Sequence, residues 1–381
     1  MDNGASTSGT GATARLGDVL DALDEIFPWE LAGRREPGGL LLGSADSKVT
    51  GVTCAVDLTA DAVEAAAAMR HDLLVVHHPN LLTRTGNPHD PDTPAGRVAS
   101  RATREGISIV ACYKNADVAP GGACDLMARA AGLRQAVPLR PTRSSFVAKV
   151  VVFVPPEAVD AVAKAMSDAG AGVIGDYTEC SFRSAGTGTF VPPAGSGPYS
   201  GKPGEFNRVE EICLEMVCPS FRLERVKSAM KAVHPYQEVA FEVYRTGNAV
   251  PWGMGRVGDL EAERTLADIA GDLQSWSASE DVALVGEPGR KVRRLAVVPG
   301  PADRMISRAV AAGAQVLAAG EAGWHATIEA RESGIGLITT GHLESERALV
   351  GAFVGALQGA RDRKGWNMEI EGLRDREGRW C

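Results

Sequence analysis

The feature that most constrains the fold is an alternation of short apolar strands with helices, which occurs once near each end of the chain. In the first occurrence, after an amphipathic helix at 16–31, the pattern predicts strands at 49–58, 72–78 and 107–111 with helices at 62–70 and 95–105 between them. Strands that read as continuous apolar runs are typical of a parallel sheet that is buried on both faces. Residues 16–140 therefore indicate an open α/β layer.

The same alternation returns near the C-terminus and predicts a second α/β lobe. We expect its strands at 295–298, 315–319 and 335–340, and its helices at 302–312, 325–332 and 343–357. The residues between the two lobes predict strands at 148–154, 211–217 and 239–244, helices at 157–169 and 222–232, and a Gly/Ser/Pro-rich stretch at 183–204. Two βαβ-like halves of this kind suggest a ferredoxin-like α+β domain inserted into the core.

The domain boundaries are expected at joints rich in Pro and Gly, at 138–144 and 247–258. A chain of 381 residues is longer than one compact core usually holds, which agrees with several packed units. We predict a flexible tail at 1–15, a first core lobe at 16–145, the insert at 146–246, a second core lobe at 247–365 and a C-terminal tail at 366–381.

The composition excludes several classes of protein. The net charge of −8 and an aromatic content of 5% lack the basic surface and the stacking platforms of a general nucleic-acid binder. Seven cysteines without a C-x-x-C pair argue for reduced thiols rather than disulfides or a structural zinc knot. The first fifteen residues lack the apolar segment of a secretory signal, and no window holds 18 uninterrupted apolar residues. We therefore expect a cytoplasmic protein whose ligand is a small molecule or another protein.

Two adjacent imidazoles, His77 and His78, lie at the end of a predicted apolar strand. Ligands of open α/β sheets gather outside the carboxyl ends of the strands, so this position suits a binding site. Neighbouring strand residues point to opposite faces, so both can serve one centre only if the strand has ended or if two metals lie side by side. The alternative is a hydrogen-bonded pair of histidines in a strand-to-loop turn.

Two further groups follow predicted strands. His342 and Glu346 are spaced i, i+4 and can grip one ion from the same side of a helix, although a capped helix start with a surface carboxylate has the same spacing. Asp117 lies in a Gly-rich loop, where a lone carboxylate is more typical of an Asx-turn. Five nitrogen and oxygen ligands are too many for one tetrahedral ion, but they suit two metals that share a carboxylate.

Longer motifs around these residues resemble the Nif-three-like dinuclear-metal-centre family, whose members are named GTP cyclohydrolase 1 type 2 homologues. The motifs lie at 77–82, 115–122 and 341–346, and the insert adds 175–182 and 234–240. The resemblance implies a two-lobed α/β core, an insert similar to the PII and CutA domains, and subunits that form a hexameric ring. It also implies two divalent ions, Zn, Mn or Fe, held by His77, His78, Asp117, His342 and Glu346, with Glu346 as the bridge.

The sequence departs from the family pattern near the site. Tyr113 stands where the family usually has a His, Lys114 replaces a Thr, and Gly320-Glu321 replaces a Gly-Asp. None of these changes removes an implied ligand, but Tyr113 and Lys114 alter the polarity of the pocket lip.

The function that the resemblance implies is a metal-dependent hydrolase acting on a nucleotide, with His325 or Glu321 transferring protons. His325 also fits an ordinary position in the first turn of a helix. The chain has no Walker motif, so binding of a triphosphate would depend on the metals and on basic groups such as Lys114 or Arg84. The alternative is a non-catalytic, metal-binding oligomeric scaffold or regulator.

Overall fold

Two compact units make up the computed structural model, which describes residues 12–33, 38–79, 90–142, 146–175, 177–248, 250–375, 378, 379 and 381. The core unit consists of residues 1–142 and 251–381, and the inserted unit consists of residues 143–250. Both are mixtures of helices and sheets, so the predicted α/β class is confirmed. Among the described residues, no helix has the length and apolar character needed to cross a bilayer.

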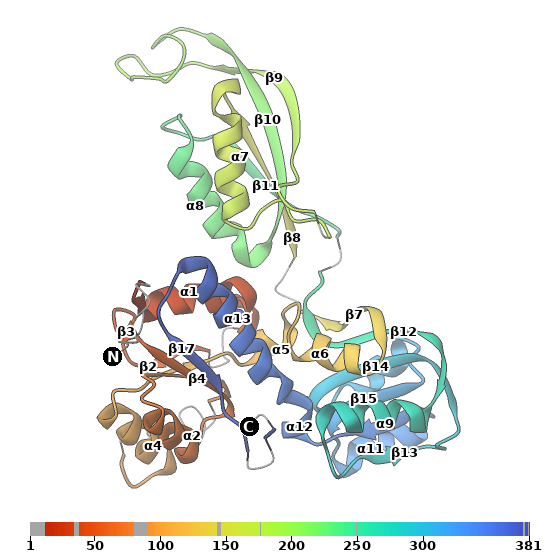
Figure 1. Cartoon of the computed structure of the whole chain (residues 1–381). Coiled ribbons are helices and arrows are strands. Elements are labelled where there is room, and N and C mark those ends of the chain that lie inside the picture. The colour runs from red at the N-terminus through yellow and green to blue at the C-terminus, as the bar shows by residue number, and fades with distance from the viewer. Residues whose placement is uncertain are drawn as a thin grey trace, which may run out of the picture. The chain divides into compact units, whose positions relative to one another are not determined.

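The first sheet of the core unit has the strand order β17-β4-β5-β6-β2, and Figure 1 shows its strands β17 and β4 side by side. Its strands are β17 (Glu369–Gly372), β4 (Gly51–Asp57), β5 (Leu73–His78), β6 (Ser108–Ala111) and β2 (Gly39–Leu42). All pairs are parallel except β2 with β6, and the central strands are almost wholly buried. One face carries α2 (Ala60–Ala68) and α4 (Pro94–Arg104), while α13 (Ala348–Lys364) contacts α1 (Leu16–Ile26), β4 and β17. The apolar runs at 49–58, 72–78 and 107–111 become strands because both faces of this sheet are covered.

The second sheet of the core unit has the order β13-β16-β15-β14-β12-β7. Its strands are β13 (Ala283–Val285), β16 (Gly336–Thr339), β15 (Val316–Glu321), β14 (Lys291–Pro301), β12 (Gly253–Thr265) and β7 (Leu133–Pro141). The three central strands are parallel, and the outer ones pair antiparallel. Helices α6 (Ala123–Ala130) and α9 (Leu266–Ser277) contribute to the core on one face, and α10 (Ile306–Ala311) and α11 (Trp324–Glu332) to the core on the other.

Three segments depart from the predicted division of the core. Strand β7 belongs to the second sheet rather than to the first lobe, because it pairs with β12 and buries Leu133 and Leu139 there. The predicted N-terminal tail is wrong for β1 (Ala14–Arg15), which pairs with β3 (Lys48–Val49); residues 1–11 lie outside the described residues. The predicted C-terminal tail is wrong for β17, because it extends the first sheet and buries Ile370.

The inserted unit has the element order strand, helix, strand, strand, helix, strand. These elements are β8 (Val147–Val154), α7 (Val159–Asp168), β9 (Phe182–Phe190), β10 (Asn207–Pro219), α8 (Leu223–Val233) and β11 (Phe241–Arg245). They form an antiparallel sheet of order β11-β8-β10-β9, and α7 and α8 share one apolar core with it. Strand β9 falls in the predicted Gly/Ser/Pro-rich stretch, because pairing with β10 along nine residues outweighs the low strand propensity of its glycines.

Candidate metal centre

The candidate metal centre forms where three segments follow strand ends of the core unit. His77 and His78 end β5, α5 (Lys114–Val118) follows β6, and α12 (His342–Glu346) follows β16. His77 and His78 are adjacent in a strand, yet their ring centroids lie only 4.3 Å apart. Because the strand ends at His78, both rings reach the same site.

The five predicted ligands lie together. Oε2 of Glu346 is 3.1 Å from Nε2 of His78, 3.4 Å from Nε2 of His342 and 3.8 Å from Nε2 of His77. Oδ1 of Asp117 is 3.5 Å from Nε2 of His77. Two atoms that are each about 2.1 Å from a tetrahedral ion lie about 3.4 Å apart, so these separations suit donors that share cations. In particular, His77, His78 and Glu346 form a group that could hold a metal ion.

Among the five predicted ligands, His77 Nε2, Asp117 Oδ1 and Glu346 Oε2 are buried and make no well-directed hydrogen bond within the described residues, and the only partners of Glu346 Oε2 there are the imidazoles that lie within ion-pair distance of it. Buried polar atoms in native proteins are almost always hydrogen-bonded, because an unpaired one costs desolvation energy. Atoms that lack a hydrogen bond and also face one another are what a cation site requires. The side chains present therefore fit a bound divalent metal.

The second nitrogen of each imidazole is held by another group. Nδ1 of His77 donates to the Cys112 carbonyl at 2.9 Å. Nδ1 of His78 lies 2.9 Å from Oδ1 of Asp57, and Nδ1 of His342 lies 3.0 Å from Oε1 of Glu321. Such partners fix the orientation of metal-binding histidines and leave Nε2 for the ion.

The protonation of the ligands follows from burial and from the carboxylates. Burial lowers the pKa of His77 to about 4 and keeps it neutral. Burial also opposes the charged form of His78, but its carboxylate neighbours outweigh that effect and raise its pKa to about 10. The contact with Glu346 raises the pKa of His342 to about 9, although burial opposes it. Burial raises the pKa of Asp117, and the nearby charge of Glu346 adds to this effect.

The charge of Glu346 is stabilised in place. Burial would raise its pKa, but the neighbouring histidines hold it well below its usual range. In the metal-free protein, Glu346 is thus an anion surrounded by imidazoles, two of which retain protons that a metal must displace.

A glycine packs against the bridging position. Gly300 has a φ of +69°, and a Cβ at this residue would lie 2.9 Å from Oε1 of Glu346 and 3.4 Å from Nε2 of His342. Its N–H donates to Oγ of Ser345 at 3.0 Å, and that hydroxyl donates to the His342 carbonyl at 2.7 Å. Residues Gly300, Ser345 and Asp57 are parts of the site that sequence reasoning missed, since only the assembled fold brings them to the ligands.

The other residues singled out in the sequence have varied positions. Glu321 contacts His342 through Nδ1, the nitrogen that faces away from the remaining ligands. His325 is exposed, and its ring makes no hydrogen bond or ion pair within the described part of the chain. The Tyr113 ring lies 5.7 Å from that of His77 and 5.8 Å from that of His78, and the Lys114 ammonium lies 5.9 Å from the Tyr113 ring. Arg84 lies outside the described residues.

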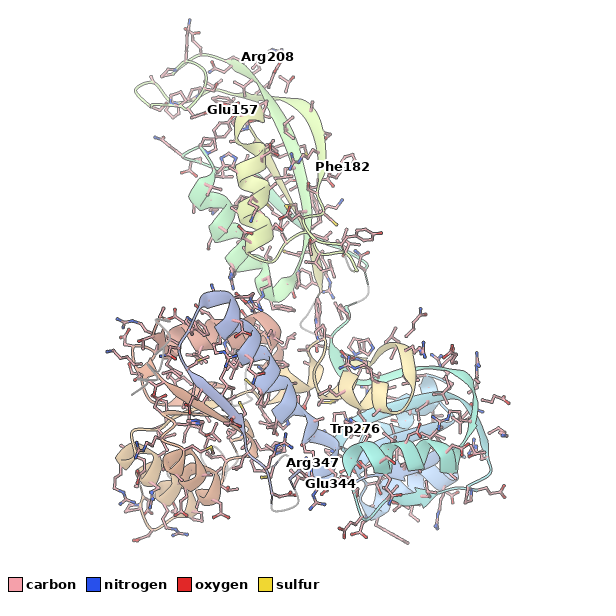
Figure 2. The ribbon with its side chains drawn as sticks, in the orientation of Figure 1. Glu157, Phe182, Arg208, Trp276, Glu344 and Arg347 are labelled. Atoms are coloured by element: carbon pink, nitrogen blue, oxygen red, sulfur yellow. The ribbon has the colours of Figure 1, made fainter. Side chains whose placement is uncertain are left out.

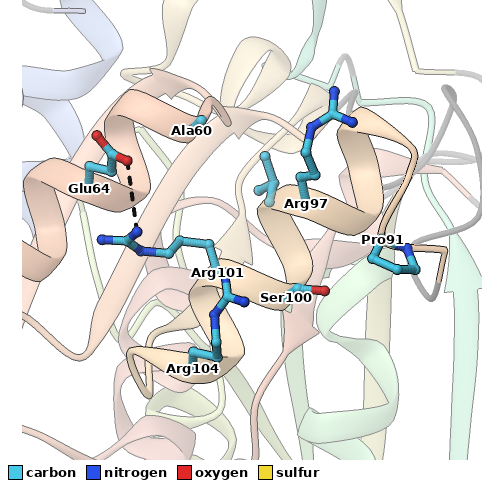
Figure 3. A pocket seen from close by; sticks show the side chains of 8 residues that line it. Ala60, Glu64, Pro91, Arg97, Ser100, Arg101 and Arg104 are labelled. Atoms are coloured by element: carbon cyan, nitrogen blue, oxygen red, sulfur yellow. Dashed lines mark ion pairs between the residues drawn. The ribbon is translucent and has the colours of Figure 1, made fainter.

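A shallow depression of about 320 Å³ lies between α2 and α4 and contains none of the predicted ligands (Figure 3). Arginines of α4 line it, and Arg101 forms ion pairs with Glu64 at 3.9 Å and Glu105 at 3.1 Å. Arg97 donates to the Asp92 carbonyl. Acidic neighbours thus account for Arg101 and a backbone contact accounts for Arg97, as on an ordinary solvated helix face.

Comparisons with known proteins cover nearly the whole chain. The family model described as Duf34/NIF3 (NGG1p interacting factor 3) matches residues 14–377. Proteins named GTP cyclohydrolase 1 type 2 homolog are similar to it: one from Halalkalibacterium halodurans is 33% identical over 85% of this chain and 87% of its own length. One from Mycobacterium tuberculosis is 36% identical over 88% and 89%. A crystal structure of a Bacillus cereus protein related to NIF3 aligns with a TM-score of 0.83 at 32% identity, covering 97% of this chain and 99% of that one.

Proposed function

The chain belongs to the Duf34/NIF3 family, and on that premise we propose that it binds two divalent metal ions and hydrolyses a nucleotide or similar small molecule. The family resemblance read from the motifs is therefore correct. The observation that carries the proposal is the convergence of five nitrogen and oxygen donors, three of which offer buried atoms without a hydrogen bond in the described structure.

Two ions fit the donor set better than one. Five protein ligands exceed what one tetrahedral ion takes, and Glu346 Oε2 lies within 4 Å of three imidazoles while Asp117 Oδ1 lies 3.5 Å from His77 Nε2. We assign Glu346 as the shared ligand. When bound, such a pair of ions polarises a substrate oxygen and lowers the pKa of water.

The protein's own groups would orient the ligands and move protons. Asp57, the Cys112 carbonyl and Glu321 fix the three imidazoles. We propose Glu321 and His325 as the proton-transfer groups, because Glu321 contacts a ligand ring and the exposed His325 lies four residues further along the same segment. Lys114, which directly follows Tyr113 at the site, supplies a positive charge for an anionic substrate.

A metal-binding oligomeric scaffold is the second candidate, because the inserted unit exposes large apolar side chains. Tyr177 is 76% exposed, Phe182 65% and Phe206 62%, and Phe182 lies on β9 (Figure 2). Phe182 and Phe206 lie toward opposite ends of the β9–β10 pair, and large apolar side chains exposed along a surface in this way can be buried in an interface between subunits. We propose that this unit takes part in a homo-oligomer, for which the family resemblance suggests a hexamer.

The first test is the metal content of the purified protein, measured by elemental analysis. We expect about two ions per chain in the wild type, and loss of both in the double variant His77→Ala, Glu346→Ala, because donors to both ions are removed. His325→Ala is the control, since its side chain lies outside the donor set and the ions should stay. A wild type that takes up no Zn, Mn or Fe would refute the site.

The second test separates enzyme from scaffold. Protein loaded with Zn, Mn or Fe is incubated with a panel of nucleotides, and the products are separated by chromatography. Turnover by the wild type that disappears in Glu346→Ala supports the hydrolase. Absence of turnover with every metal and nucleotide favours the scaffold.

A further inference from the structure

We propose that Arg256 is a positioning residue that holds Asp117 in the metal centre from the opposite sheet of the core unit. The inference rests on the proposed metal function and deepens it. Asp117 lies in α5, which follows strand β6 of the first sheet, whereas Arg256 lies in β12 of the second sheet.

Arg256 is almost completely buried, with 1% of its surface exposed. Its Nε donates to Oδ1 of Asp125 at 2.5 Å, and its Nη1 donates to the carbonyls of Gly253 and Gly255 at 2.7 and 2.9 Å. Its Nη2 reaches the Val118 carbonyl at 3.5 Å. The guanidinium is therefore anchored to its own strand and extends to the residue that follows Asp117.

Asp125 extends this contact to the loop between α5 and α6. Its other oxygen, Oδ2, accepts the N–H of Gly121 at 2.7 Å, so one carboxylate joins Arg256 to the turn after α5. Asp125 is 24% exposed on its side chain, so its negative charge does not itself require the arginine. The arginine, in contrast, is too deeply buried to remain without a negative partner.

Asp117 depends on such outside support because α5 is only five residues long and has no side-chain cap. A helix of this length is not stable by itself in water, so its neighbours determine where its carboxylate lies. Asn115 anchors the start of α5 by donating to the Phe27 carbonyl at 2.7 Å. The contacts of Arg256 and Asp125 anchor its end.

The origin of the anchor matters for the metal centre. His342 and Glu346 follow β16 of the second sheet, and Arg256 belongs to that same sheet. Arg256 thereby fixes Asp117, from the first sheet, relative to ligands carried by the second. Groups that support metal ligands in this way are typically worth about 10- to 100-fold in metal affinity.

The test measures Zn²⁺ binding by the full-length chain, with stoichiometry and both dissociation constants obtained by calorimetry and chelator competition. Arg256→Met keeps the length of the side chain but removes its five donors. We expect it to weaken one of the two ions by about 10- to 100-fold and to leave the other unchanged. Arg256→Lys retains the charge opposite Asp125 but loses the fork to the carbonyls, so it should fall between Met and the wild type.

Arg264→Met is the matched control. Arg264 lies in the same strand, but it pairs with Asp272 at 2.5 Å and with the Asp268 carbonyl, both in α9, so both ions should bind as in the wild type. The visible spectrum of Co²⁺-loaded protein gives a second readout, because it changes with the ligands of the metal and not with stability alone. Arg256→Met should alter this spectrum, and Arg264→Met should not.

Asp125→Asn decides the question if Arg256→Met does not fold, since Asn keeps an acceptor for Gly121 and removes the charge opposite Arg256. Wild-type affinity for both ions in a folded Arg256→Met or, failing that, in Asp125→Asn overturns the inference. If the wild type binds a single ion, the dinuclear proposal fails, while the shift in that one dissociation constant still tests Arg256. A wild type that binds no ion overturns both.

Discussion

Replacing Gly300 by alanine tests whether the position of Glu346 controls metal binding. The added Cβ would lie 2.9 Å from Oε1 of Glu346, whereas ordinary contacts begin near 3.4 Å. The carboxylate must therefore move by about 0.5 Å, which is the limit within which a functional constellation keeps its geometry. We expect Zn²⁺ affinity to fall by about 10- to 100-fold, the range found when the support of a metal ligand is disturbed.

The positive φ of Gly300 adds a separate loss of stability, which a control variant at another glycine can measure. At a φ of +69°, replacing glycine by alanine lowers the free energy of unfolding by about 1–2 kcal/mol, whatever the surroundings of the residue. Gly334 has a φ of +68°, and a Cβ added there would have no heavy atom within 4 Å among the described residues, so Gly334→Ala carries the same backbone cost without touching the site.

Urea unfolding in a chelator should show similar losses of unfolding free energy for Gly300→Ala and Gly334→Ala. Chelator competition with Zn²⁺ should then separate them, since only Gly300→Ala displaces a ligand. Equal Zn²⁺ affinities for the two variants would refute the assignment of Glu346 as a ligand whose position matters.

Three further results are expected. Glu321→Gln removes the charge that holds Nδ1 of His342, so Zn²⁺ affinity should fall by up to about tenfold, while Glu329→Gln on α11 leaves the dissociation constant unchanged. Zn²⁺ affinity should rise between pH 6 and 9, because His342 and His78 have pKa values of about 9 and 10 in the metal-free protein and must lose their protons before they can bind the metal. Calorimetry in buffers of different ionisation enthalpy would detect the released protons, and an affinity that does not change with pH would contradict this prediction. Chelation should lower the unfolding temperature, since ions that bind only the folded chain contribute about 2.7 kcal/mol at 100 times their dissociation constant, and an unchanged temperature would show that no such ions were bound.

The parallel strands of the core were predictable because a strand that is buried on both faces needs apolar residues at almost every position, and such a run is visible in the sequence. Strands β4, β5 and β6 lie within the predicted ranges 49–58, 72–78 and 107–111. Strands β9 and β17 were not predictable, since glycines or charged residues fill them and their structure depends on a partner strand. The position of β7 in the second sheet likewise depends on its pairing with β12.

The site divides in the same way. Histidines and carboxylates at strand ends stand out in a sequence because their chemistry is specific, and the structure brings those five together. The sequence does not show Asp57 as a partner of His78, because the two residues are 21 positions apart and only the register between β4 and β5 places them side by side. The pairing of Arg256 with Asp125 spans 131 residues and depends on packing between β12 and α6.

The division of the donors between two sheets links metal binding to the arrangement of the core unit. His77, His78 and Asp117 follow strands of the first sheet, and His342 and Glu346 follow a strand of the second. Neither sheet alone supplies the set. Desolvated donors without hydrogen bonds cost free energy in the metal-free protein, so the packing that assembles them must come from elsewhere in the fold.

The contacts between the sheets identify where that packing comes from. Arg256 joins β12 to the segment of Asp117, and α13 continues from α12 to pack against β4 and β17 of the first sheet. Because these contacts do not use the ligand atoms, they can hold the donors together before an ion arrives. If the proposed ions bind, they would remove the desolvation cost of the unpaired donor atoms rather than the cost of bringing those donors together, and they would stabilise an arrangement that the two sheets already impose.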